Sequence, residues 1–260
     1  MGGGIKIWSN TPEKGVAMKN QMNERQPLRA VVIFVISILC FGVVQGIFGA
    51  RASADDATDA RQLVERSKLT LETFMRAPET EGFRNLVRTA KGVFIAPQVL
   101  RGAFFLGASG GSGVFLARDS GGGGWLGPVF YTIGGISFGF QIGGEASEVI
   151  FLAMTDRGVS ALLKDSVRLG ADVGIAVGPI GAGVDASTAN LSADILTFSR
   201  SKGLYGGISL EGAFVKVRGD WNSAYYGLNV APADVLVTKV VTNRHALELI
   251  NLLSQASGAR

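Results

Sequence analysis

Two chemically versatile side chains are almost absent from this sequence. Its 260 residues contain one cysteine, Cys40, and one histidine, His245. A zinc site takes three or four ligands, mostly cysteine and histidine, and the sequence has neither an EF-hand calcium loop nor a Walker-type phosphate loop. We therefore predict a protein without cofactor or metal, and without thiol or disulfide chemistry.

Charge is absent from residues 30–49, which read AVVIFVISILCFGVVQGIFG. An apolar run of about 20 residues is long enough for a membrane-spanning helix or for the core of a signal peptide. Arginines precede the run, and residues 52–54, Ala-Ser-Ala, provide the small side chains that signal peptidase requires. We expect residues 1–54 to be an export segment cleaved after Ala54, leaving a single periplasmic domain over residues 55–260. The alternative is an uncleaved inner-membrane anchor formed by residues 30–49.

A strong net charge is also missing once the export segment is set aside. The chain has 25 basic and 21 acidic residues, and residues 1–54 hold six of the basic and two of the acidic ones. The 19 basic and 19 acidic residues that remain cancel. A neutral domain offers no general electrostatic attraction to nucleic acid, so we predict no nucleic-acid partner.

Four segments have the apolar spacing of helices. Residues 55–76 place apolar side chains on one stripe and acids in the first turn, and residues 78–91 form a second, shorter stripe. Residues 156–164 and 243–255 predict an inserted helix and a C-terminal helix.

Glycine is abundant between these helical segments. Residues 91 to 227 hold 28 of the 37 glycines, mixed with β-branched and aromatic residues in short runs. Runs such as VFIAPQVL, SEVIFLAM and DILTFS predict strands, and glycine clusters such as GASGGSG at residues 107–113 predict turns between them. The expected fold class is α+β: a curled, barrel-like antiparallel glycine-rich sheet with N-terminal, inserted and C-terminal helices.

Two stretches match the G-x-S-x-G pattern of serine hydrolases, around Ser109 and Ser137. That pattern presents a serine on a sharp turn between a strand and a helix, and neither stretch is followed by a predicted helix. Chance matches are expected in glycine- and serine-rich sequence. Serine hydrolysis is therefore only the third hypothesis for function.

Charged residues interrupt several predicted strands. They are Glu148, Asp172, Arg200 and Glu211. A buried carboxylate is costly unless it is paired. These residues therefore form an internal polar network with arginine, face water, or contact a ligand. The internal network is the simpler interpretation.

Basic residues gather on the second predicted helix. Arg84, Arg88 and Lys91 follow at intervals of four and three residues, which places them on one face, and Arg101 lies nearby in the sequence. Such a face is either solvated or holds anionic lipid headgroups, where each basic residue contributes about 1 kcal/mol.

The order of the segments is informative as a whole. From about residue 63 to residue 227 the chain reads AKGVFIAPQVL, GASGGSGVFL, GWLGPVFYTIGGISFGFQIGGEASEVIFLAMT, RLGADVGIAVGPIG, ILTFSRSKGLYGGISLEGAFV and YYG. This succession resembles the SYLF domain, a lipid-binding family also described as the yeast actin-regulator type.

The resemblance implies a non-enzymatic domain that binds phosphoinositides or other anionic phospholipids, and that in eukaryotic relatives works at actin-rich membranes. An exported bacterial protein does not meet actin, so the implied partner is an anionic phospholipid membrane of the envelope. The family's lipid binding is associated with its N-terminal helix. On the matching helix this implies contacts by Arg61, Arg66 and Lys68 and insertion of Leu71 and Phe74. The second hypothesis is a structural or protein-interaction module with an envelope protein as partner.

Overall fold

The computed structural model describes residues 54–103, 106–121, 124–138, 143–181, 192–206 and 210–258. The predictions for residues 1–53, including the export segment and the alternative anchor, lie outside the described residues. Within the described ranges, no helix is both long and apolar enough to cross a membrane. Residues 52–260 form one compact unit.

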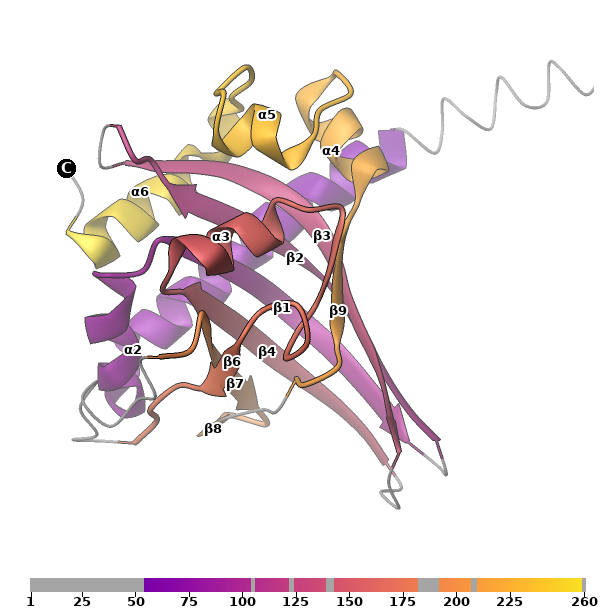
Figure 1. Cartoon of the computed structure of the whole chain (residues 1–260), viewed down its shortest axis with the longest axis vertical. Coiled ribbons are helices and arrows are strands. Elements are labelled where there is room, and N and C mark those ends of the chain that lie inside the picture. Colours follow the sequence, from indigo (N-terminus) through magenta and orange to yellow (C-terminus); the bar gives the residue numbers. More distant parts are fainter. Residues whose placement is uncertain are drawn as a thin grey trace, which may run out of the picture. The chain divides into compact units, whose positions relative to one another are not determined.

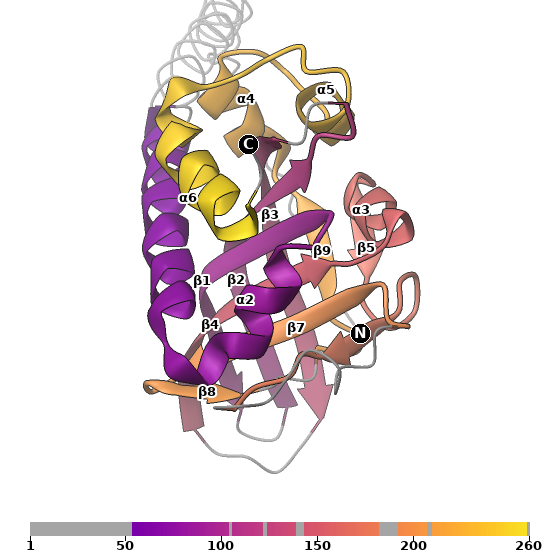
Figure 2. The ribbon, with the colours of Figure 1, turned by 90° about the vertical axis from the view of Figure 1, so that its left-hand side faces the viewer.

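The beginning of this unit is helical, as its apolar spacing predicts. Residues 54–76 lie in one helix, which we call the N-terminal helix. A 3-10 turn, η1 (Pro78–Thr80), then leads into α2 (Glu81–Val87). Pro78 occupies the first position of η1, where its missing N–H costs no hydrogen bond. The turn allows α2 to fold back onto the same face of the sheet as the N-terminal helix (Figure 2).

One curled sheet forms the centre of the domain and contains the nine strands found in the described residues. Its middle consists of four long antiparallel strands: β1 (Gly92–Ala103), β2 (Leu106–Arg118), β3 (Trp125–Phe138) and β4 (Gly143–Ala153). Shorter strands extend it: β5 (Ser166–Arg168), β6 (Ile175–Val177), β7 (Ile195–Ser201), β8 (Leu204–Gly206) and β9 (Phe214–Val217).

The strand order explains the curvature of this sheet. It runs β5-β9-β3-β2-β1-β4-β7-β6, with β8 paired to β7 and only the β6–β7 pair parallel among the described strands. The two outermost strands of this order, β5 and β6, are consecutive in the chain, so the sheet bends into a half-barrel (Figure 1). The α+β prediction with a curled sheet is confirmed.

The remaining helices follow the long strands. The inserted helix α3 (Asp156–Leu162) and the C-terminal helix α6 (Leu247–Ser257), which η3 (Arg244–Ala246) precedes, confirm two predicted helices. Two others, α4 (Gly219–Tyr226) and α5 (Pro232–Leu236), were not predicted. Both are shorter than three turns, too short for an apolar stripe to be recognised in the sequence.

Alternating residues of the central strands build two cores, one on each face of the sheet. In β1, Val93 and Ile95 join the core beneath the helices, whereas Phe94 and Ala96 join the core on the opposite face. The N-terminal helix, α2 and α6 cover the first face (Figure 2). The second face is covered by α3, α5, β5 and β9 (Figure 1).

Leu71 and Phe74 of the N-terminal helix belong to the first core and are fully buried. The expectation that they insert into lipid is therefore corrected. The apolar stripe of this helix already faces the sheet, which leaves these two side chains no exposed surface to offer a membrane.

The glycine cluster at residues 107–113 is a strand, not the predicted turn. It belongs to β2 and pairs with β1 on one side and with β3 on the other. At Gly111 the absence of a side chain is required, because a Cβ atom there would lie 2.3 Å from the carbonyl oxygen of Gln98. Glycine in this strand permits a close backbone approach.

Candidate functional site

A cleft of about 430 Å³ opens between the sheet and the N-terminal helix. Four parts of the chain contribute to it: Arg66 of the N-terminal helix, Pro97 and Gln98 of β1, residues 146–148 of β4, and Arg200 and Lys202 at the end of β7. Three of its side chains are basic and one, Glu148, is acidic. We call it the cationic cleft.

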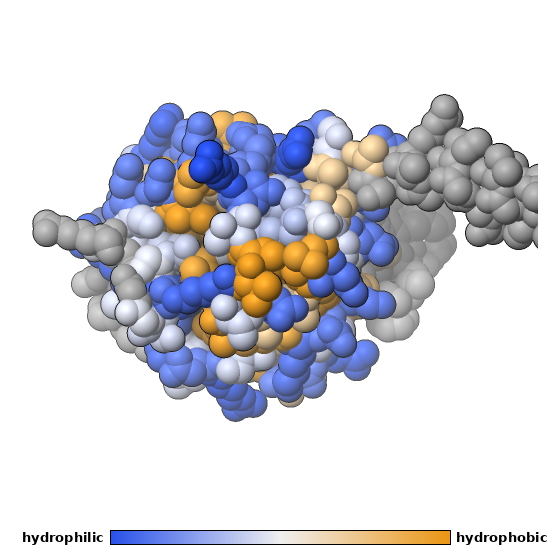
Figure 3. All heavy atoms as spheres, turned by 90° about the horizontal axis from the view of Figure 1, so that it is seen from above, coloured by the Kyte–Doolittle hydropathy of each residue, from blue (hydrophilic) through white to orange (hydrophobic). Residues whose placement is uncertain are grey.

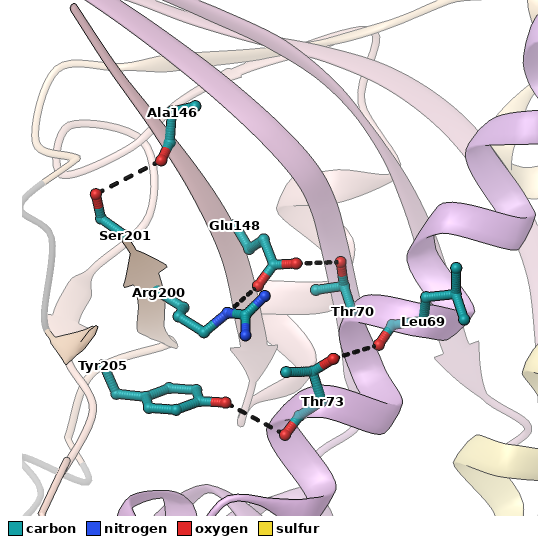
Figure 4. Close-up of polar contacts among 8 residues, drawn as sticks. All are labelled: Leu69, Thr70, Thr73, Ala146, Glu148, Arg200, Ser201 and Tyr205. Carbon is teal, nitrogen blue, oxygen red and sulfur yellow. Dashed lines mark hydrogen bonds and ion pairs between the residues drawn. The ribbon is translucent and has the colours of Figure 1, made fainter. Parts of the chain in front are cut away.

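Glu148 and Arg200 form an ion pair at this cleft (Figure 4). The register of β4 and β7 places the two residues directly opposite each other, and the Arg200 Nε donates to a carboxylate oxygen of Glu148. Thr70 of the N-terminal helix donates to the other carboxylate oxygen at 3.3 Å. The hydrogen bond to Glu148 is the main cause that raises the pKa of Arg200, so the guanidinium stays charged.

Tyr205 of β8 also contacts the Arg200 guanidinium. The guanidinium carbon lies 5.9 Å from the centre of the Tyr205 ring, within the range of a cation–π contact. The Tyr205 hydroxyl donates to the Thr73 carbonyl oxygen of the N-terminal helix at 3.3 Å (Figure 4). Burial raises the pKa of Tyr205, which keeps the phenol protonated as this donor. Arg200 is therefore fixed from two sides.

Arg66 and Lys202 supply the excess positive charge of the cleft. Arg66 is exposed, and its Nε donates to the Gln62 carbonyl oxygen of its own helix at 3.4 Å. Lys202 is also exposed and has no hydrogen bond or ion pair with any described residue. The sequence analysis singled out Arg66 but missed Lys202, because a lysine in a surface turn gives no signal by itself.

One exposed leucine, Leu100, flanks the cationic cleft. Leu100 is 55% exposed and pairs across β1 and β4 with Ala146, which lines the cleft. Leu204 is 76% exposed but is paired with Ser201, so it lies on the opposite face of the β7–β8 hairpin from Arg200 and Tyr205. Cations without a carboxylate partner among the described residues and one exposed apolar side chain, Leu100, thus occur together at this cleft.

The predicted basic face of the second helix is not a free surface. Arg84 is half-buried and donates to the Ala77 carbonyl oxygen, and the Lys91 ammonium lies 2.6 Å from a carboxylate oxygen of Asp156. Only Arg88 of the three is exposed without a carboxylate partner in the described structure. Two of the three charges are thus engaged within the domain.

The other predicted lipid contacts are spread over the domain. Arg61 is exposed on the N-terminal helix, and Lys68 forms an ion pair with Glu248 of α6. Arg101 is half-exposed and lies opposite Glu145 in the register of β1 and β4. Of the residues predicted on the N-terminal helix, only Arg66 reaches the cationic cleft.

Asp172 and Glu211 lie in turns rather than in strands, and this corrects the predicted polar network. Asp172 is exposed and accepts the backbone N–H of Arg168 at 2.7 Å, which closes its own turn. Glu211 is exposed in the turn before β9. Of the four charged residues predicted inside strands, the structure brings only Glu148 and Arg200 together.

Both serines of the G-x-S-x-G matches lie inside strands. Ser109 belongs to β2 and pairs with Gly135, and Ser137 belongs to β3 and pairs with Gly107. Neither stands on a turn into a helix, which the hydrolase pattern requires. His245 instead contacts Glu65, at 3.2 Å, and Tyr225. The structure gives the third hypothesis no support.

A second surface is apolar. Between α4 and the start of α6 the chain exposes four large apolar side chains, Leu228, Val237, Val240 and Leu247, each about half exposed or more. Seen from above, the face that carries α4 and α5 shows a gathered hydrophobic area bordered by polar surface (Figure 3). Gathered exposed apolar surface of this kind is typical of sites that contact other molecules.

These features define a binding domain: a helix-covered half-barrel with a charged cleft and an apolar patch. The comparisons with known proteins show which family it resembles. Residues 134–256 match the family described as Ysc84, Las17-binding protein actin regulator. The chain is thus similar to the Ysc84 (SYLF) family, and the resemblance that its segment order indicated is confirmed. This is a family of binding and regulatory proteins, not a known enzyme family.

Related proteins carry the same domain within longer chains. SH3 domain-containing YSC84-like protein 1 is 33% identical over 172 residues in Rattus norvegicus, covering 65% of this chain and 50% of that protein. The Homo sapiens protein of the same name is 33% identical over 171 residues, with 65% and 49% covered. Protein YSC84 of Saccharomyces cerevisiae is 31% identical over 173 residues, with 65% and 36% covered. This chain thus spans half or less of the length of these relatives.

Proposed function

We propose that this domain binds the surface of anionic phospholipid membranes and catalyses no reaction. The observation that carries the proposal is the cationic cleft with Leu100 exposed beside it. A basic residue contributes about 1 kcal/mol near an anionic membrane, and an apolar side chain contributes about 1.5 to 3 kcal/mol when fully removed from water. Peripheral proteins combine these two contributions to remain on a bilayer.

The membrane in question is that of the bacterial envelope, reached by export. This part of the proposal rests on the apolar run at residues 30–49 and the small residues before the expected cleavage site. N-terminal sequencing of the protein isolated from its own cells should find Asp55 first. A protein that retains residues 30–49 would instead be anchored in the inner membrane.

Sedimentation with vesicles tests the membrane proposal. Residues 55–260 should sediment with vesicles that contain cardiolipin and should stay in solution with phosphatidylcholine vesicles. The bound fraction should fall as salt rises, because added ions screen exposed charges. A Lys202→Glu, Leu100→Ser double variant should bind about tenfold more weakly or worse, since it reverses one charge and removes one apolar contact.

The matched control for this experiment is Arg88→Glu. It introduces the same charge reversal on an exposed arginine outside the cleft, and we expect it to change vesicle binding less than twofold. Equal loss in both variants would mean that net charge, not the cleft, governs binding. Absence of the wild-type protein from both pellets would refute the membrane proposal.

A protein-interaction module is the second candidate, and the apolar patch near α5 favours it. The family description, Las17-binding protein actin regulator, and the name of one Saccharomyces cerevisiae relative, LAS seventeen-binding protein 3, also point to protein partners. The vesicle experiment separates the two candidates. A failure to sediment, together with one defined envelope protein cross-linked through Val237 or Val240 in cells, would favour the second.

A further inference from the structure

The central strand β1 is interrupted where it passes the cationic cleft. Pro97 stands in the middle of β1, between β2 and β4, although proline cannot donate to a sheet and is normally found at edges or bulges. The pairing of β1 with β2 shifts between Ile95 and Gln98, and its pairing with β4 shifts between Ala96 and Val99. Bulges of this kind occur beside binding sites, where they redirect the chain.

Ser147 of β4 lies next to this bulge. The residue is only 6% exposed, lines the cleft and pairs with Val99, directly after the bulge. Its hydroxyl has no hydrogen-bond partner among the described residues. The paired Val99 belongs to the second core, so the Ser147 side chain lies on that face of the sheet, away from Glu148 and Arg200.

Lys202 adopts a left-handed backbone conformation, in which lysine is seldom found. It has a φ of 50° and is followed by Gly203 with a φ of 81° in the two-residue turn between β7 and β8. Asparagine or glycine is preferred at such positions because most side chains are strained there. Among the described non-glycine residues only Lys239 shares a positive φ, and its ammonium is paired with Asp119 at 2.7 Å. No described residue pairs with the Lys202 ammonium, so no contact within the domain explains why a lysine occupies this turn position.

We infer that the cationic cleft is a binding site for a phosphate group. The guanidinium groups of Arg200 and Arg66 and the ammonium of Lys202 supply positively charged donors. Glu148 occupies the Arg200 Nε and so orients the guanidinium, whose two amino groups retain donors for phosphate oxygens. A volume of about 430 Å³ admits a small phosphate ester.

This inference deepens the proposed membrane function, on which it rests, because a phospholipid headgroup presents a phosphate to the cleft. A soluble phosphate ester presents the same group. An experiment can distinguish the phospholipid headgroup from the soluble ester. The cleft can bind the soluble ester even if the domain does not bind a membrane.

Titration calorimetry with sn-glycerol 3-phosphate tests the site directly, using residues 55–260, which contain both cores of the compact unit. The wild-type domain should bind this ester, and Lys202→Asn should bind it about tenfold more weakly because one charged hydrogen-bond donor is lost. The thermal midpoint of Lys202→Asn should stay the same or rise, since asparagine tolerates the turn conformation. The controls Ser147→Ala, on the opposite face of the sheet, and Arg88→Gln, outside the cleft, should both bind like wild type.

The outcomes distinguish this inference from the membrane proposal. Binding of the ester without sedimentation on cardiolipin vesicles would support the phosphate site and refute the membrane function. Sedimentation without binding of the ester, and with unchanged sedimentation of Lys202→Asn, would overturn the phosphate site alone. Equal weakening by Lys202→Asn and Arg88→Gln would also overturn it, because binding would then follow net charge.

Discussion

Replacing Gly111 by alanine is expected to lower the free energy of unfolding by about 2 to 3 kcal/mol. The new Cβ atom would lie 2.3 Å from the Gln98 carbonyl oxygen and 3.1 Å from the Val99 Cα atom. Both are backbone atoms of the bulge in β1, so no side chain can turn away to relieve the overlap. The bulge must move, and the cationic cleft that Gln98 lines must change shape with it.

Gly110→Ala is the control for this substitution. It adds the same methyl group one residue earlier in β2, where nothing lies within 4 Å of the new atom. Urea unfolding of both variants should show a large loss of stability for Gly111→Ala and a change within about 0.5 kcal/mol for Gly110→Ala. Equal stability of the two variants would mean that β1 does not approach β2 in this way.

The same region shows why part of the sheet could not be predicted. A local reading assigns the glycine cluster at residues 107–113 to a turn, because glycine favours turns. In the structure its backbone is paired on both sides by strands that are distant in sequence, and these hydrogen bonds outweigh the local preference. The apolar runs of β1, β4 and β7 were predictable because β-branched and aromatic residues mark them directly.

The cationic cleft was predictable only in part. Glu148 and Arg200 stood out as charges within apolar strand sequence, and the register of β4 and β7 makes them neighbours. Lys202 gave no such signal, because its role depends on the conformation of the turn between β7 and β8. A site built from four separate parts of the chain requires the tertiary structure to be recognised.

The N-terminal helix shows a different limit of sequence reasoning. An apolar stripe on a helix is the same signal whether the stripe faces a membrane or a protein core. The resemblance implied that Leu71 and Phe74 insert into lipid, whereas both are fully buried against the sheet. A stability measurement can distinguish these two roles.

Phe74→Ala is therefore expected to destabilise the domain by about 3 to 5 kcal/mol in the absence of any membrane. The Phe74 ring lies 5.5 Å from the Phe83 ring and 5.2 Å from the Tyr205 ring, both in edge-to-face contact. Removing it leaves a cavity between the N-terminal helix, α2 and β8. Since Tyr205 also holds Arg200, the loss should loosen the cationic cleft as well.

Leu69→Ala on the same helix is the matched control, because Leu69 is 59% exposed. It should change the free energy of unfolding by no more than about 0.5 kcal/mol. Phe74→Leu, which keeps most of the volume, should cost less than Phe74→Ala and remain folded for binding measurements. If Phe74 served lipid insertion, Phe74→Ala would unfold at the same urea concentration as wild type and lose only its binding to vesicles. That result would restore the membrane role of this helix and contradict its place in the core.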